Sequence, residues 1–165
     1  MKKLGEEAIR FFQTQGCVIV STIDKEGRPH SACKGIVTIE QGGKVYIMDL
    51  FKAETYLNIQ RSPHISITAV DEHRFKGYCL KGKASIVPPE ELPAAIIKDW
   101  ESRISSRITQ RVLKNLREEK GHHSHPEALL PHPEYMIVLE VEEIVDLTPH
   151  FLRQGEQNGE HIQRQ

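Results

Sequence analysis

The chain has 165 residues, of which 38% are hydrophobic, and its 22 basic and 23 acidic side chains leave a net charge of −1. This length fits one domain with a small core, and the balanced charge gives no sign of a nucleic-acid or anionic-membrane partner. No apolar run approaches the roughly 18 residues that a membrane-spanning helix needs, and the N-terminus turns acidic after Leu4, where a signal peptide would turn apolar. We therefore predict a cytoplasmic protein.

Hydrophobic periodicity and turn residues divide the chain into short elements. In chain order, the predicted elements are a helix over 5–13, strands over 17–23, 30–40 and 44–49, a short helix over 53–61, strands over 65–70 and 75–87, a helical insertion at about 89–120, and a strand over 135–141. Gly27 suits a positive φ in the first hairpin turn, and Gly77 and Gly82 predict bulges or points of close approach in the strand over 75–87. Ser105 and Ser106 predict a break in the long helix.

Six strands joined by short turns, with helices inserted after the third and the fifth, predict a mainly β antiparallel barrel rather than a parallel sheet. The barrel domain is expected to span residues 1–150. The polar segment 151–165 is predicted to be a disordered or domain-swapped tail. The sequence contains no G-x-G-x-x-G motif, no Walker loop and no G-x-S-x-G motif, so Rossmann, P-loop and α/β-hydrolase chemistry are not expected.

Cysteines and histidines are the other candidate reactive residues. Cys17, Cys33 and Cys79 are odd in number and widely spaced in strand-like runs, so we expect buried free thiols rather than a disulfide framework or a metal site. The cluster His122, His123 and His125 lies in a proline-rich segment, which favours a solvated loop over a metal centre. Trp100 is expected to anchor a core or an interface.

The junction between the third strand and the short helix carries a candidate phosphate site. Lys52 stands just before the helix and Thr55 in its first turn. Unpaired backbone amides and a partial positive charge make a helix N-terminus suited to an anion. An exposed lysine on a connector helix is the alternative interpretation. By the first interpretation, this junction holds the phosphate of a nucleotide-like cofactor.

Three segments resemble the pyridoxamine 5′-phosphate oxidase-related flavoproteins of the FMN-binding split-barrel superfamily. They are the hairpin Val20–His30, the junction with its helix and following strand over Lys52–Ile67, and the strand segment Leu80–Ala84. The middle segment is the most specific of the three. The resemblance covers about residues 5–87, with a weaker similarity over 135–147.

The resemblance implies a six-stranded split barrel that forms a homodimer with two FMN sites at the subunit interface. It implies that Lys52 and the groups around Thr55 hold the phosphate. The residues implied to line the isoalloxazine are His30, Ser31, Ala32, Cys33 and Lys34 on one wall and Met48, Asp49, Leu50 and Phe51 on the other. A strand-surface histidine is an equal alternative for His30, and a core position is the alternative for Cys33. Gly77 and Tyr78 are implied to approach from the other subunit.

The C-terminal segment lacks the arginine-rich substrate pattern of the full oxidases, so vitamin B6 phosphates are not the expected substrate. The resemblance then implies a flavin-dependent oxidoreductase that acts on a small molecule or an electron partner. A relative that uses a deazaflavin is one alternative. A haem-binding, haem-degrading or non-catalytic flavin-binding protein is another, since some split-barrel relatives use a histidine as the axial ligand of haem.

Overall fold

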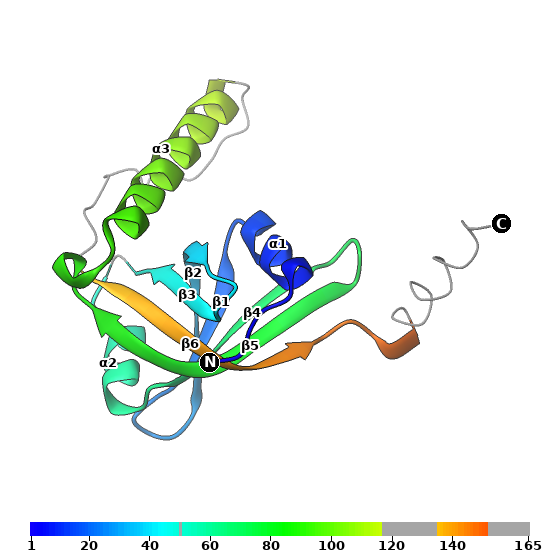
Figure 1. Ribbon diagram of the computed structural model, residues 1–165, viewed down its shortest axis with the longest axis vertical. Helices are drawn as coiled ribbons and strands as arrows, with labels where there is room; N and C mark the ends of the chain where they lie inside the picture. The colour runs from blue at the N-terminus through cyan, green and yellow to red at the C-terminus, as the bar shows by residue number, and fades with distance from the viewer. Residues whose placement is uncertain (50, 117–134, 152–165) are drawn as a thin grey trace.

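The computed structural model describes residues 1–49, 51–116 and 135–151 (Figure 1). Its six strands are β1 (Val18–Ile23), β2 (Pro29–Ile39), β3 (Lys44–Met48), β4 (His64–Asp71), β5 (Lys76–Val87) and β6 (Met136–Asp146). They close into a barrel in the order β1-β2-β3-β6-β5-β4, and every neighbouring pair is antiparallel. The predicted antiparallel six-stranded barrel is therefore confirmed.

Two short helices cover opposite ends of the barrel. Helix α1 (Glu6–Thr14) inserts Phe11 and Phe12 into the core, where Phe11 packs edge-on against Tyr78 near the start of β5. Helix α2 (Glu54–Arg61) covers the other end, and its Tyr56 packs against Tyr135 just before β6. Both helices present apolar side chains at helical spacing, so burial of one face against the barrel stabilises them.

A second core lies outside the barrel wall, beneath α3 (Ala94–Leu116). A single 3₁₀ turn, η1 (Pro89–Glu91), connects β5 to this helix. Residues at three- and four-residue spacing in and just before the helix (Leu92, Ile96, Trp100 and Ile104) cover the outer faces of β2, β3 and β6. Figure 1 shows the rest of α3 extending away from the barrel.

Helix α3 is continuous through Ser105 and Ser106, so the predicted break is wrong. Serine has only a modest helix penalty, and both residues are exposed on a helix whose other face is held by Trp100 and Ile104. Trp100 is buried and its indole Nε1 donates to Met48 Sδ, which confirms the expected packing role.

Glycines at two predicted positions match their expected roles. Gly27 has a φ of 78° in the β1–β2 turn. The register between β5 and β6 shifts at Gly82, where a Cβ atom would lie 2.0 Å from the backbone oxygen of Glu140. Only glycine therefore allows β6 to approach β5 at this bulge.

The expectation that all three cysteines are buried is wrong for two of them. Cys17 and Cys33 are exposed, and only Cys79 is buried. Cys33 lies opposite Ile19 on the outer face of the barrel, because the inner positions of β2 are taken by the residues opposite Val18 and Val20. The histidine cluster at 122–125 and almost all of the predicted tail lie outside the described residues.

Candidate functional site

The predicted cofactor site lies where β3 ends and α2 begins, and a network of backbone contacts fixes this connection. Tyr135 donates its hydroxyl hydrogen to the carbonyl oxygen of Phe51 at 2.9 Å, and the amide of Ala53 donates to the same oxygen at 2.8 Å. Phe51 is 60% exposed, and Lys52 is exposed beside it. The segment between strand and helix therefore presents an aromatic ring and an ammonium group at the surface.

Helix α2 begins with no side chain capping its N-terminus. Ala53 is the N-cap residue, and Glu54 opens the first turn. Thr55 is only 2% exposed, so its hydroxyl does not lie at the surface beside Lys52. The first turn thus offers amide donors next to Lys52, as a phosphate requires.

An ion pair lies beneath this surface. Lys34 of β2 donates to Asp49 Oδ1 just after β3, and the two side chains are 14% and 1% exposed. Among the described residues, the other carboxylate oxygen, Asp49 Oδ2, is buried and accepts no hydrogen bond. A buried oxygen without a donor is costly, so an N–H or O–H group brought into this site would be stabilised there.

A second polar chain links β2 to α2 through the barrel wall. The hydroxyl oxygen of Thr22, Oγ1, lies 3.4 Å from His30 Nδ1 and accepts a hydrogen bond from Asn58 Nδ2 at 2.8 Å. Arg61 in turn donates to Asn58 Oδ1 at 2.5 Å and to Glu54 at 3.3 Å. This chain fixes α2, and therefore its first turn, against the strand that carries His30.

Sequence reasoning did not identify Asn58 or Thr22, although a signal was present. Thr55, Asn58 and Ile59 are the buried residues of α2, and their spacing is that of one helix face. A fully buried asparagine on that face needs hydrogen-bond partners. The periodicity of the short helix could therefore have indicated that Asn58 points inward at a polar contact.

The predicted cofactor residues of β2 lie on both faces of the barrel wall. His30, Ala32 and Lys34 are partly buried, and they alternate with Ser31 and Cys33, which are exposed on the outer face. On that face, the hydroxyl oxygen of Ser31 lies 3.1 Å from the hydroxyl oxygen of Ser21. Met48 is buried under α3, and Leu50 lies outside the described residues. The structure brings together Lys34, Asp49, Phe51, Lys52 and Thr55 at the end of β3 and the start of α2.

Gly77 and Tyr78 are packed within the barrel of this chain, and their expected approach to the site of the other subunit stays a prediction. Tyr78 belongs to the barrel core and packs against Phe11. Burial, with a smaller effect of Glu7, raises the pKa of its phenol above the usual value. Gly77 is buried, and a Cβ there would lie 3.0 Å from the oxygen of Ala69.

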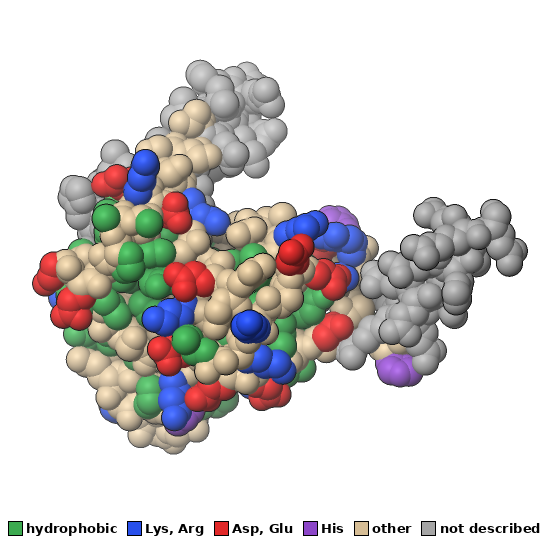
Figure 2. Space-filling view, in the orientation of Figure 1, with side chains coloured by type: hydrophobic (Ala, Val, Ile, Leu, Met, Phe, Trp, Pro, Cys, Tyr) green, Lys and Arg blue, Asp and Glu red, His purple; other side chains and the backbone are tan. Residues whose placement is uncertain are grey.

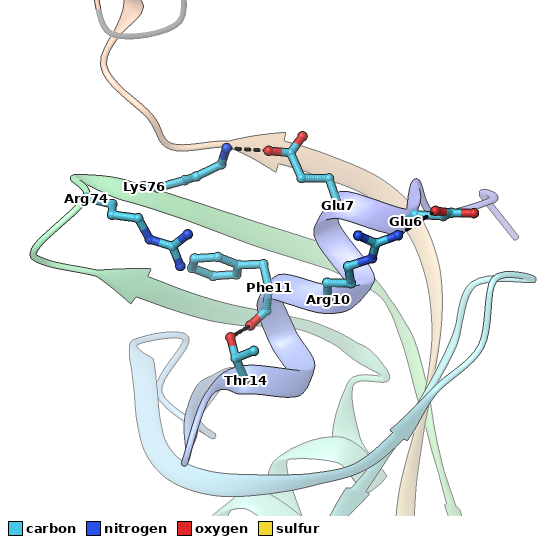
Figure 3. Close-up of a pocket in the computed structure, with 7 residues that line it drawn as sticks. All are labelled: Glu6, Glu7, Arg10, Phe11, Thr14, Arg74 and Lys76. Atoms are coloured by element: carbon cyan, nitrogen blue, oxygen red, sulfur yellow. Dashed lines mark hydrogen bonds and ion pairs between the residues drawn. The ribbon is translucent and has the colours of Figure 1, made fainter. Parts of the chain in front are cut away.

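A cavity of about 470 Å³ lies at the opposite end of the barrel, between α1 and the β4–β5 hairpin (Figure 3). Phe11 lines it, Glu7 of α1 pairs with Lys76 of β5, and Glu6 pairs with Arg10 one turn along α1. Because these charges are already paired with one another, the cavity gives less support for an anion site than the start of α2 does.

The sequence profile of the family described as pyridoxamine 5′-phosphate oxidase matches residues 4–144. The chain belongs to this family. The match covers β1 to β5 in full and β6 up to residue 144. The resemblance found over residues 5–87 and 135–147 therefore extends through the whole domain. No curated protein sequence matches the chain.

Solved structures of related proteins share the fold. HupZ of Group A Streptococcus is 19% identical, with a TM-score of 0.58 over 88% of this chain and 94% of that chain. A Lactobacillus delbrueckii protein provisionally named a pyridoxamine 5′-phosphate oxidase is 18% identical, with a TM-score of 0.58 over 88% and 95%. An F420 reductase is 14% identical, with a TM-score of 0.54 over 86% and 98%. At these identities the likeness establishes the architecture alone.

Within the described ranges, no three His, Cys, Asp or Glu side chains are grouped so as to hold a metal ion. No helix in the same ranges has the length and apolar character needed to cross a membrane. On the face shown in Figure 2, acidic and basic side chains are interspersed and form no extended field of one sign.

Proposed function

We propose that this member of the pyridoxamine 5′-phosphate oxidase family binds FMN as a homodimer and acts as a flavin-dependent oxidoreductase on a small organic substrate or electron partner. The observation that carries the proposal is the uncapped start of α2 directly after Lys52. An ammonium group beside unpaired amides is what a phosphate group needs.

The residues around this anchor fit the rest of the cofactor. The exposed ring of Phe51 gives an apolar surface for the flat isoalloxazine. Asp49 Oδ2, which has no hydrogen-bond partner among the described residues, can accept a hydrogen bond from a ribityl hydroxyl or a ring N–H. Bound flavin would supply the electron transfer, so the chain itself needs to bind, orient and shield the cofactor rather than provide an acid–base pair.

Exposed apolar residues support the proposed dimer. Ile19, Ile23 and Val70 are 43%, 43% and 58% exposed on the outer faces of β1 and β4. Three large apolar side chains on one barrel surface favour contact with another subunit. Light scattering of the purified protein tests this part: a mass of two chains is expected, and a monomer at micromolar concentration would contradict it.

An absorbance spectrum of the protein as purified, with identification of the molecule released on denaturation, tests the cofactor. We expect a flavin spectrum and free FMN. Lys52→Ala should weaken FMN binding by about 1.5–3 kcal/mol, the value of one charge-assisted bond. Lys25→Ala, which removes an exposed lysine from the β1–β2 turn, is the matched control and should bind normally. Equal affinity of both variants would overturn the phosphate assignment.

A deazaflavin is the second candidate cofactor, because an F420 reductase is among the proteins with this fold. Both cofactors need a flat apolar surface and an anion anchor, so the same residues would be used. The released molecule distinguishes the two: FMN supports the first proposal, and F420 the second.

A further inference from the structure

The hydrogen-bond chain that links α2 to β1 and β2 fixes the direction of each bond along it. Asn58 is fully buried, so both ends of its amide need partners. A guanidinium group can only donate, and Arg61 lies 2.5 Å from Asn58 Oδ1, so this atom is the amide oxygen. The amide nitrogen of Asn58 therefore donates to Thr22, and the hydroxyl oxygen of Thr22 is the acceptor.

The hydroxyl of Thr22 also has one hydrogen of its own to donate. The side chain is 2% exposed, so this hydrogen needs an acceptor within the protein. Among the described residues, His30 Nδ1 lies within reach, at 3.4 Å from the hydroxyl oxygen. A hydrogen on His30 Nδ1 would give Thr22 a second donor and leave its own hydrogen buried and unpaired, which is unfavourable. His30 is therefore held with Nδ1 as an acceptor and its hydrogen on Nε2.

The Nε2–H group of His30 is the edge of the ring that a ligand can meet. Nδ1 is directed at the buried Thr22, whereas His30 itself is only partly buried. His30 lies on the same face of β2 as Lys34, and four residues of strand separate them by about 13 Å. Lys34 pairs with Asp49, which lies three residues before Lys52. A ligand anchored at the start of α2 must therefore be elongated to reach His30.

We propose that His30 is a specificity-determining residue whose Nε2–H donates a hydrogen bond to a carbonyl oxygen on the ring system of the bound cofactor. This inference rests on the proposed function, because it needs a cofactor whose phosphate lies at the start of α2. A neutral imidazole in this tautomer is committed as an acceptor at Nδ1 and donates at Nε2. It therefore selects an acceptor atom, and the pyrimidine ring of a flavin or a deazaflavin carries carbonyl oxygens of this kind.

Nitrogen-15 NMR of the cofactor-free protein tests the tautomer without any ligand. At about pH 9, where an ordinary imidazole is neutral, we expect a hydrogen on Nε2 of His30 and none on Nδ1. Thr22→Val should move the Nδ1 signal toward that of His73, whose side chain is 91% exposed, and Thr22→Ser should keep the native signal. A hydrogen on Nδ1 in the native protein would overturn the proposal, and this result does not depend on the folding of any variant.

Fluorescence titration with FMN and with riboflavin tests the contact to the cofactor. His30→Phe keeps a flat ring but removes the N–H group, so it should weaken the binding of both ligands by the same factor, about 2- to 13-fold. The factor is the same because the contact is to the ring system and not to the phosphate. His30→Gln, which offers an amide donor, should restore most of the affinity. His73→Phe is the matched control and should bind both ligands as the native protein does.

Two outcomes of the titration would overturn the proposal. One is equal affinity of His30→Phe and the native protein for both ligands. The other is a loss confined to FMN, which would put His30 at the phosphate instead of the ring. Failure of the proposed function gives a different result: the native protein would bind neither ligand, and the donor role of His30 would fall with it, while the tautomer stays measured by NMR. Circular dichroism checks that each variant is folded.

Discussion

The Lys34–Asp49 pair gives a prediction whose size follows from its burial. With 14% and 1% of the two side chains exposed, the pair lies largely out of water. Asp49 Oδ2 has no hydrogen-bond partner among the described residues, so Lys34 provides the main compensation for the carboxylate charge. Replacing Lys34 with methionine leaves that charge buried and unpaired, which costs about 3–5 kcal/mol. This is a large part of the about 5–15 kcal/mol that stabilises a typical domain.

Urea unfolding of the cofactor-free protein at neutral pH measures this cost. Lys34→Met should lower the unfolding free energy by the predicted amount, and the double variant Lys34→Met with Asp49→Asn should recover most of it. Lys83→Met is the control, because Lys83 is 58% exposed and lies 3.9 Å from Glu142, and a surface pair contributes at most about 1 kcal/mol. If Lys34→Met stays within about 1 kcal/mol of the native protein, the reasoning from burial is refuted.

Three further changes test the fold. Gly82→Ala should destabilise the protein by about 1–3 kcal/mol, since its Cβ would meet the opposing backbone of β6, whereas Gly42→Ala enters open space and should be near neutral in the same urea assay. Trp100→Ala should cost about 3–5 kcal/mol by emptying the core under α3, and an unchanged thermal midpoint would contradict the packing. Arg74 holds the pKa of Asp71 below 3.8. The stabilisation from Asp71 is therefore present above pH 3.8 and lost as the pH falls through its lower folded pKa, and Asp71→Asn should abolish that part of the acid sensitivity.

The fold was predictable because its signals are local. The β-branched runs gave the strands, and turn residues such as Gly27 gave the hairpins. The continuity of α3 was not predictable from Ser105 and Ser106, because packing on one face of a helix outweighs a small propensity penalty at exposed positions.

The candidate site was only partly predictable, for a different reason. Lys52 and Thr55 follow from their place at a helix start, which is a local feature. The partner of Lys34 is Asp49, 15 residues away and just after β3, so the pair depends on strand register. The segment of β2 around Cys33 lacks clear apolar alternation, so the sequence did not show which of its residues face outward.

The difference in affinity between FMN and riboflavin most directly tests the claim that the start of α2 holds a phosphate. Fluorescence titration of the cofactor-free protein would measure both ligands, which differ only in the phosphate group. We predict that the native protein binds FMN about 10- to 150-fold more tightly than riboflavin, equivalent to about 1.5–3 kcal/mol, and that Lys52→Ala removes most of this difference. Equal affinity of the native protein for the two ligands, or a preference for FMN that survives Lys52→Ala unchanged, would contradict the account.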